Sequence, residues 1–194
     1  GVSFKALLEL KVMADVGLVG LPNAGKSSLI AALSKAHPKI ADYPFTTLHP
    51  VVGVVELPGH RSFVMADIPG IIEGASGGRG LGLQFLKHVE RTRVLLFVLD
   101  VSAFADTAAA EALSVLQREV RQYGHDLQRK SFLIAANKTD LDHDGESLRR
   151  FVETIGPAHA GAVFPISAVT HAGLDRLTEA LYRMLHGADA AQDG

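Results

Sequence analysis

The chain has 194 residues, of which 47% are hydrophobic and 21% are charged, and its formal net charge is −2. These values are typical of one globular domain of ordinary size. The net charge gives the fold as a whole no electrostatic footprint for nucleic acid, and it leaves a local basic patch open. The sequence contains no cysteine, which excludes a disulfide partner and a thiolate site and fits a reducing compartment without proving one. No apolar run reaches the roughly 20 residues of a membrane span, and we expect no membrane partner.

The chain begins with a segment that we interpret as a connection. Residues 4–13 are apolar with partial alternation, and residue 1 is a glycine rather than methionine. We therefore expect 1–13 to be a linker from an upstream domain, with the chain a fragment of a longer protein. The folded domain is expected over 14–186 and a frayed tail over 187–194.

A glycine-rich stretch organises the sequence that follows. Residues 20–27 carry the pattern G-x-x-x-x-G-K-S. An apolar run at 16–19 predicts a strand over 15–20 before it, and a helical pattern at 28–36 predicts a helix over 27–36 after it. Strand, loop and helix in this order predict a phosphate-binding loop, in which backbone N–H groups and the helix N-terminus face the anion. Lys26 would add its charge at the β- and γ-phosphates, and the Ser27 hydroxyl would hold Mg²⁺. The predicted nucleotide contacts here are Gly20, Leu21, Pro22, Asn23, Ala24, Gly25, Lys26 and Ser27.

Residues 37–50 contain three prolines and no regular period, which predicts a loop. It carries two neighbouring threonines, Thr46 and Thr47. A threonine hydroxyl and backbone N–H can meet Mg²⁺ and the γ-phosphate, so this loop would be ordered by a triphosphate. The alternative is a proline-rich turn in which the threonines bond the local backbone.

Two β-rich runs, 51–57 and 61–66, flank a Pro-Gly-His turn and predict a hairpin, so one strand of the sheet should be antiparallel. The second run ends in Asp67-Ile68-Pro69-Gly70. An aspartate at this position typically holds Mg²⁺ through its second shell, and the Gly70 N–H can reach the γ-phosphate. The Asp-x-x-Gly pattern is common in turns, so the predicted magnesium and phosphate contacts depend on its position at the end of a strand.

Residues 71–82 hold five glycines and predict a mobile loop that leads into a helix at 83–91. Arg79 lies inside the loop, where it is either an arginine finger or an ordinary solvated arginine. His49 and His88 are interpreted as ordinary polar positions, because neither is paired with a nucleophile.

The remaining sequence alternates strands and helices. Apolar runs predict strands at 93–99, 131–136 and 162–166, and helical spacing predicts helices at 106–123, 146–155 and 174–185. The fold class is therefore α/β, a P-loop NTPase three-layer sandwich around a mostly parallel doubly wound sheet with one antiparallel strand. Each motif follows a strand, which places all of them at the carboxyl edge of the sheet.

The stretch Asn137-Lys138-Thr139-Asp140 follows the predicted strand 131–136 and indicates which purine is bound. A carboxylate only accepts hydrogen bonds, and guanine presents two donors on one edge, so Asp140 can accept both. Asn137 can bond the O6/N7 edge and hold the phosphate loop, while the Lys138 stem covers the base plane. After the strand at 162–166, Ser167, Ala168 and Val169 would contribute a backbone N–H to guanine O6. The alternative interpretation of 137–140 is a common turn.

Together these motifs resemble the G domain of the bacterial Obg GTPases over about residues 7–186. The resemblance is carried by the segments 14–27, 43–47, 67–75, 80–82, 84–86 and 90–95. It implies hydrolysis of GTP to GDP with Mg²⁺, a cytoplasmic location, association with the large ribosomal subunit, and an N-terminal glycine-rich domain. By motif, Ser27 and Thr47 would be the direct Mg²⁺ ligands. The triphosphate would be lined by Phe45, Thr46, Thr47, Leu48 and His49.

Two positions bear on the rate of hydrolysis. Many GTPases orient the attacking water with a glutamine after Asp-x-x-Gly, but here the residue is Ile71, which predicts slow turnover. Asn23 resembles the asparagine of family members in which K⁺ bridges the phosphates, although a turn residue is the alternative. The predicted catalytic residues are Lys26, Thr47, Gly70 and Asn23.

Three functions remain open from the sequence: a GTP/GDP switch enzyme, a ribosome-docking module that hydrolysis resets, and an ATPase or kinase. Asp140 disfavours the third.

Overall fold

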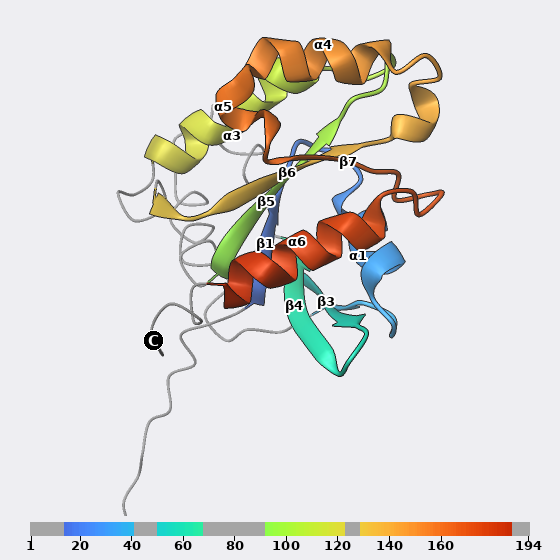
Figure 1. The fold of residues 1–194 in the computed structure, drawn as a ribbon, viewed down its shortest axis with the longest axis vertical. Coiled ribbons are helices and arrows are strands. Elements are labelled where there is room, and N and C mark those ends of the chain that lie inside the picture. Colours follow the sequence, from blue (N-terminus) through green and yellow to red (C-terminus); the bar gives the residue numbers. More distant parts are fainter. Residues whose placement is uncertain (1–13, 41–49, 68–91, 123–128, 188–194) are drawn as a thin grey trace, which may run out of the picture.

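The computed structural model describes residues 14–40, 50–67, 92–122 and 129–187 (Figure 1). The strands are β1 (Ala14–Val19), β2 (Lys39–Ile40), β3 (Val51–Leu57), β4 (Arg61–Asp67), β5 (Thr92–Asp100), β6 (Phe132–Asn137) and β7 (Val163–Pro165). The helices are α1 (Lys26–Leu33), α3 (Ala109–Gln122), the 3₁₀ turn η2 (Thr139–Leu141), α4 (Glu146–Ile155), α5 (Pro157–Ala160) and α6 (Leu174–His186).

The strands form one sheet in the order β2-β3-β4-β1-β5-β6-β7. Strands β4, β1, β5, β6 and β7 run parallel to one another, whereas β3 is antiparallel to both β2 and β4. Strand β3 is thus the one antiparallel strand among those described. The predicted fold class, a mostly parallel doubly wound α/β sheet, is confirmed.

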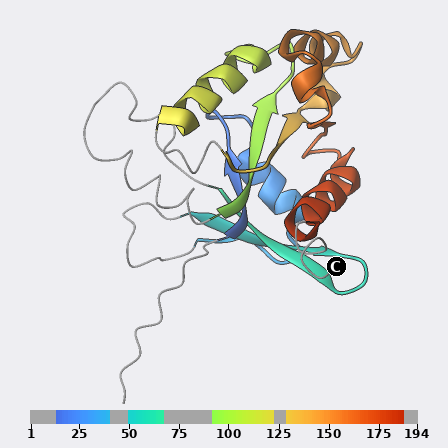
Figure 2. The same ribbon diagram turned by 60° about the vertical axis from the view of Figure 1, so that its left-hand side comes forward.

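Helices cover both faces of the sheet, which gives three layers (Figure 2). Helices α1 and α6 pack on one face, where Leu29 and Leu181 join Leu96 in a buried cluster. Helices α3 and α4 pack on the other face, where Leu116 and Phe151 join a second cluster. Successive residues of β5 point to opposite faces, so a strand with both faces covered needs an uninterrupted apolar sequence.

Three elements differ from the sequence prediction. Helix α1 ends at Leu33 rather than near residue 36, because Ser34 is extended and forms an antiparallel bridge with Val55. The predicted loop 37–50 includes the short strand β2, which pairs with the start of β3. Helix α5 was not predicted. It begins at Pro157, a residue whose fixed φ suits the first turn of a helix.

Several expectations lie outside the described residues. They are the linker 1–13, the segment 41–49, the glycine-rich loop 71–82, the helix 83–91 and the tail from 188 onward. Within the described part of the chain, no helix combines the length and apolarity that crossing a membrane requires.

Candidate nucleotide-binding site

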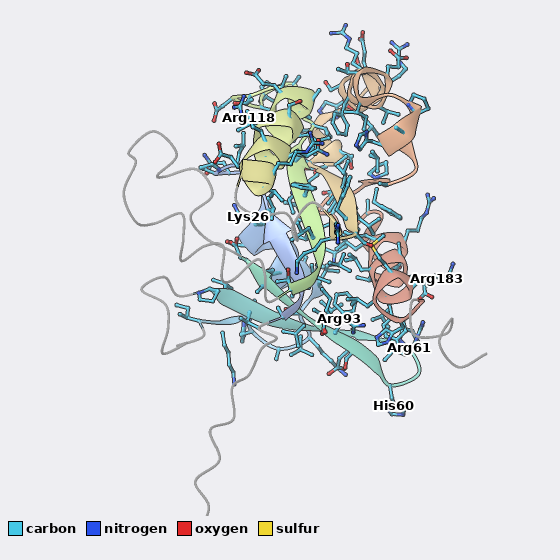
Figure 3. All side chains as sticks on the ribbon, turned by 90° about the vertical axis from the view of Figure 1, so that its left-hand side faces the viewer. Lys26, His60, Arg61, Arg93, Arg118 and Arg183 are labelled. Carbon is cyan, nitrogen blue, oxygen red and sulfur yellow. The ribbon has the colours of Figure 1, made fainter. Side chains whose placement is uncertain are left out.

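The carboxyl ends of the parallel strands bring the predicted motifs to one edge of the sheet. Leu18 of β1 is in register with Asp67 of β4, and Asp100 of β5 is in register with Asn137 of β6. Figure 3 shows Lys26 at this edge, far along the sheet from His60 at the tip of the β3–β4 hairpin. Ligands of doubly wound sheets bind at such an edge, so we take it as the candidate site.

Close packing explains both glycines of the loop signature. A Cβ atom on Gly20 would lie 2.6 Å from the Val98 carbonyl oxygen of β5. A Cβ atom on Gly25 would lie 2.3 Å from Nδ2 of Asn137, and Gly25 also has a left-handed φ of +94°. The loop therefore packs its two ends against β5 and β6, and α1 begins directly after Gly25.

Lys26 is held against the start of its own loop. Its Nζ donates hydrogen bonds to the carbonyl oxygens of Gly20, at 3.0 Å, and Leu21, at 3.3 Å. An ammonium group has three donors, so this anchoring leaves one for a further acceptor. A positive charge fixed at the N-terminus of α1 is suited to an anion.

Beside the loop, the oxygen-bearing side chains of Ser27 and Asp67 contact each other. The Ser27 hydroxyl donates to Oδ2 of Asp67 at 3.3 Å. The second oxygen, Oδ1, is buried and has no hydrogen-bond partner among the described residues. Burial raises the pKa of Asp67, and Lys26 and Ser27 oppose that rise.

This arrangement fits Mg²⁺. A hydroxyl and a carboxylate are the hard oxygen groups that Mg²⁺ prefers, and a buried unpartnered carboxylate oxygen is stabilised by a nearby cation or by water bound to one. Thr47, the other expected direct ligand, lies outside the described residues.

Asn137 joins the phosphate loop to the segment after β7. The side chain is 2% exposed. Its Nδ2 donates to the Ala24 carbonyl at 2.9 Å, and its Oδ1 accepts from the Ala168 N–H at 3.1 Å. The expected contact between Asn137 and the phosphate loop is therefore present. One Nδ2 hydrogen remains for a further acceptor.

Asp140 provides an acceptor that has no donor in the described structure. It lies in η2, and its Oδ1 is buried without a hydrogen-bond partner. Thr139 fixes this turn, since both its N–H and its hydroxyl donate to the Ile166 carbonyl, at 3.2 and 3.0 Å. The 137–140 and 167–169 segments are thus locked together, as a site that reads a purine edge requires.

The segment after β7 has its own internal bonds. The Ser167 N–H donates to the Ala172 carbonyl at 3.0 Å, and its hydroxyl accepts from the Thr170 N–H at 3.0 Å. Ser167 is fully buried, whereas Val169 is 76% exposed. Ser167 and Ala168 are therefore fixed in place by the protein, while Val169 projects from it.

The structure adds one residue that we did not single out from the sequence. Asp100, the last residue of β5, accepts a hydrogen bond from Lys138 Nζ at 2.6 Å through Oδ2, and from the Ser102 N–H at 2.9 Å through Oδ1. Burial raises the pKa of Asp100, but the hydrogen bonds from Lys138 and Ser102 outweigh it, and the net pKa is lowered. Like Asp67, Asp100 ends an apolar strand, and this position could have identified it from the sequence.

Eight predicted contact residues fall outside the described part of the chain, so their positions stay predictions. They are Phe45, Thr46, Thr47, Leu48, His49, Ile68, Pro69 and Gly70. Ile71, Arg79 and His88 are also outside it.

Comparisons with known proteins agree with this arrangement. Residues 15–138 match the MMR_HSR1 family, described as "50S ribosome-binding GTPase". The chain belongs to this family. "GTPase Obg" of Desulfitobacterium hafniense (strain DSM 10664 / DCB-2) is 50% identical over 186 residues, which cover 96% of this chain and 43% of that protein. "GTPase Obg" of Desulforudis audaxviator is 53% identical over 178 residues, covering 92% and 41%.

These matches confirm the resemblance to the Obg GTPases. The chain spans about half the length of the curated relatives it matches.

Solved structures with the same fold include GTPases of other kinds. Era in complex with MgGDPNP and nucleotides 1506–1542 of 16S ribosomal RNA is 25% identical, with a TM-score of 0.66, and the match covers 91% of this chain and 57% of Era. The G domain of the T. maritima FeoB iron transporter is 22% identical, with a TM-score of 0.60, and covers 87% of this chain and 96% of that domain. The second likeness supports the P-loop GTPase fold alone.

Proposed function

We propose that the chain binds GTP and GDP and hydrolyses GTP to GDP as a slow molecular switch. The observation that carries this proposal is the pairing of two features at one sheet edge: Lys26 anchored in a phosphate-binding loop, and a buried, unpartnered Asp140 oxygen. The first feature suits phosphates and the second suits the two donors of guanine. Asn137, which bonds both the loop and the Ala168 N–H, supports a single ligand spanning the two.

In this proposal the residues divide by the part of the nucleotide they meet. The loop residues 20–27 and Lys26 hold the phosphates, with Phe45–His49 and Gly70 completing the triphosphate contacts. Asn137–Asp140 and Ser167–Val169 hold the base. Ser27 and Thr47 hold Mg²⁺ and Asp67 supports it from the second shell; bound there, Mg²⁺ would neutralise phosphate charge.

Slow hydrolysis is proposed because Ile71 stands where a water-orienting glutamine is usual. K⁺ bound through Asn23 would supply part of the missing charge. Asn23 has a left-handed φ of 64°, so its backbone conformation does not distinguish a K⁺ ligand from a plain turn residue. GTP turnover measured in KCl and in NaCl distinguishes them: we expect faster turnover in KCl, and equal rates would remove the potassium role.

Direct binding tests the function itself. Isothermal titration with GDP, GTP and ATP in the presence of Mg²⁺ should give measurable affinity for both guanine nucleotides and none comparable for ATP. Equal affinity for ATP would favour the ATPase or kinase interpretation. No binding of GDP or GTP would refute the proposal.

We further propose the large ribosomal subunit as the partner of the complete protein, in the cytoplasm. The family description names 50S binding, and the resemblance to the Obg GTPases implies association with the large ribosomal subunit. A ribosome-docking module, in which hydrolysis only resets binding, is the second candidate, and the slow cycling expected from Ile71 leaves it open. Co-sedimentation of the complete protein with 50S subunits in GDP and in a non-hydrolysable GTP analogue separates them, since a switch should bind differently in the two states.

A further inference from the structure

The clearest unassigned feature of the site is the contact between Asp100 and Lys138. Lys138 has a left-handed backbone, with a φ of 67°, and lies between Asn137 and Asp140 in the segment that we assign to the base. Its Nζ is 2.6 Å from Asp100 Oδ2, and the two side chains are 29% and 18% exposed. Such a short, largely enclosed contact fixes the far end of a long and otherwise flexible side chain.

Asp100 is itself held rigidly. Its other oxygen accepts the Ser102 N–H, and strand register places it directly beside Asn137. The Val101 N–H also donates to the Asn137 carbonyl at 3.0 Å, which ties the end of β5 to the end of β6. The carboxylate is thus presented to Lys138 by the sheet and does not depend on a loop conformation.

The Lys138 side chain also borders the phosphate loop. A cavity of about 110 Å³ is lined by residues of both segments, among them Leu21, Pro22, Asn23, Asp100 and Lys138. A lysine with no partner would extend its ammonium into water and sample many rotamers, and ordering it again on ligand binding would lower the affinity.

We propose that Asp100 is a positioning residue for the purine: by holding the Lys138 ammonium, it keeps the Lys138 methylene stem in place as one wall of the base site. This inference rests on the proposed function, because it concerns the base of a guanine nucleotide. Asp100 does not touch the nucleotide itself. It acts through Lys138 and not through the hydrogen-bonding edge of the base, which is assigned to Asp140.

The test is a cycle of variants in this chain, with dissociation constants measured for GDP, GTP and IDP. The variants are Asp100→Asn, Lys138→Met and the double variant. Asp144→Asn is the matched control, because Asp144 is exposed and, like Asp100, accepts a hydrogen bond from the backbone N–H two residues ahead. Asparagine keeps an oxygen for the Ser102 N–H but loses the charge that holds Lys138. Methionine keeps an apolar stem and has no ammonium to draw it into water.

We expect Asp100→Asn to raise Kd about tenfold, as typical pairwise coupling energies suggest. The increase should be the same for GDP, GTP and IDP, because IDP differs from GDP at the edge that Asp100 does not influence. Asp144→Asn should stay within about twofold of the unsubstituted chain, and the double variant should bind no more weakly than Asp100→Asn alone.

Three results would overturn the inference. They are a Kd for Asp100→Asn equal to that of Asp144→Asn, losses that multiply in the double variant, and a change in the GDP/IDP ratio. Thermal unfolding in saturating GDP reports whether each variant is folded. If Asp100→Asn is not folded, the Kd of the double variant is compared with the Kd of Lys138→Met. A tenfold higher Kd for the double variant also overturns the inference. Failure of the unsubstituted chain to bind GDP would instead refute the proposed function and the inference together.

Discussion

The sharpest prediction concerns Asp140→Asn. In the proposed complex the carboxylate accepts hydrogen bonds from N1–H and the 2-amino group of guanine. An asparagine of the same shape offers one acceptor and one donor, so one hydrogen bond is lost and an N–H faces the guanine amino group. Hydrogen bonds to a charged group contribute about 1.5–3 kcal/mol each, and leaving a buried donor unpaired adds to the loss.

We therefore expect GDP affinity to fall by about 3 kcal/mol, or roughly 100-fold in Kd. Xanthine has a carbonyl in place of the 2-amino group, and it matches the donor and acceptor of asparagine. The variant should consequently prefer XDP to GDP, whereas the unsubstituted chain should prefer GDP.

Titration calorimetry with GDP and XDP measures both affinities. Asp144→Asn is the matched control, because Asp144 is exposed, lies four residues away and bonds the Glu146 N–H at 3.0 Å. It should leave the GDP/XDP ratio unchanged. If Asp140→Asn also leaves this ratio unchanged, Asp140 does not read the base and the assignment of the 137–140 segment is wrong.

Three other substitutions, one of them paired with a control, test the framework of the site and of the helix that follows it. Gly25→Ala adds a Cβ only 2.3 Å from Asn137 at a φ of +94°, so we expect a lower thermal midpoint and at least about tenfold weaker GDP binding. Gly59→Ala, with a φ of +81° and nothing within 4 Å, should show the backbone strain alone. Asn137→Ala leaves the Ala24 carbonyl and the Ala168 N–H without their partner and should lower the free energy of unfolding by about 3 kcal/mol, measured by urea denaturation. Asp142→Ala removes the acceptor of the Ser147 and Leu148 N–H groups at the start of α4 and should cost about 1 kcal/mol at pH 7. Burial raises the pKa of Asp142, but these two donors outweigh it and lower the pKa below its ordinary 3.8, so the stabilisation is present above that value and is lost as the pH falls through the lower folded pKa. Unfolding curves at pH 7 and pH 3 should therefore show a smaller difference between the two chains at pH 3, and an unchanged difference would contradict the role of the Asp142 charge.

Much of the fold could be predicted because its signals are local. Residues 94–99 of β5 include no polar position, and only a strand with both faces covered accepts such a sequence. The glycine-rich turn between β1 and α1 is recognised from its residue types and their order. Once the strands are taken as parallel, the site follows, since every motif comes after a strand and their carboxyl ends share one edge.

The parts that could not be predicted depend on partners distant in the sequence. Strand β2 has two residues, too few for a period, and exists through its pairing with β3. Helix α1 stops before Ser34 because Val55 pairs with that residue, which no helix-ending signal in the local sequence indicates. In the sequence, Asp100 looks like any polar residue at the end of an apolar strand. Only the register between β5 and β6 shows which lysine it contacts.

Asn137 connects the separate segments of the site. Its side chain supports the Ala24 carbonyl and the Ala168 N–H, its backbone carbonyl accepts the Val101 N–H, and its Nδ2 fills the space that a side chain at position 25 would need. The phosphate-binding loop and the base-reading segments thus rest on one buried residue. Hydrogen-bonded groups that share a buried partner are not energetically independent. A substitution that moves Asn137 should therefore weaken binding of the phosphates and the base together, whereas substitution of Asp140 should affect the base alone.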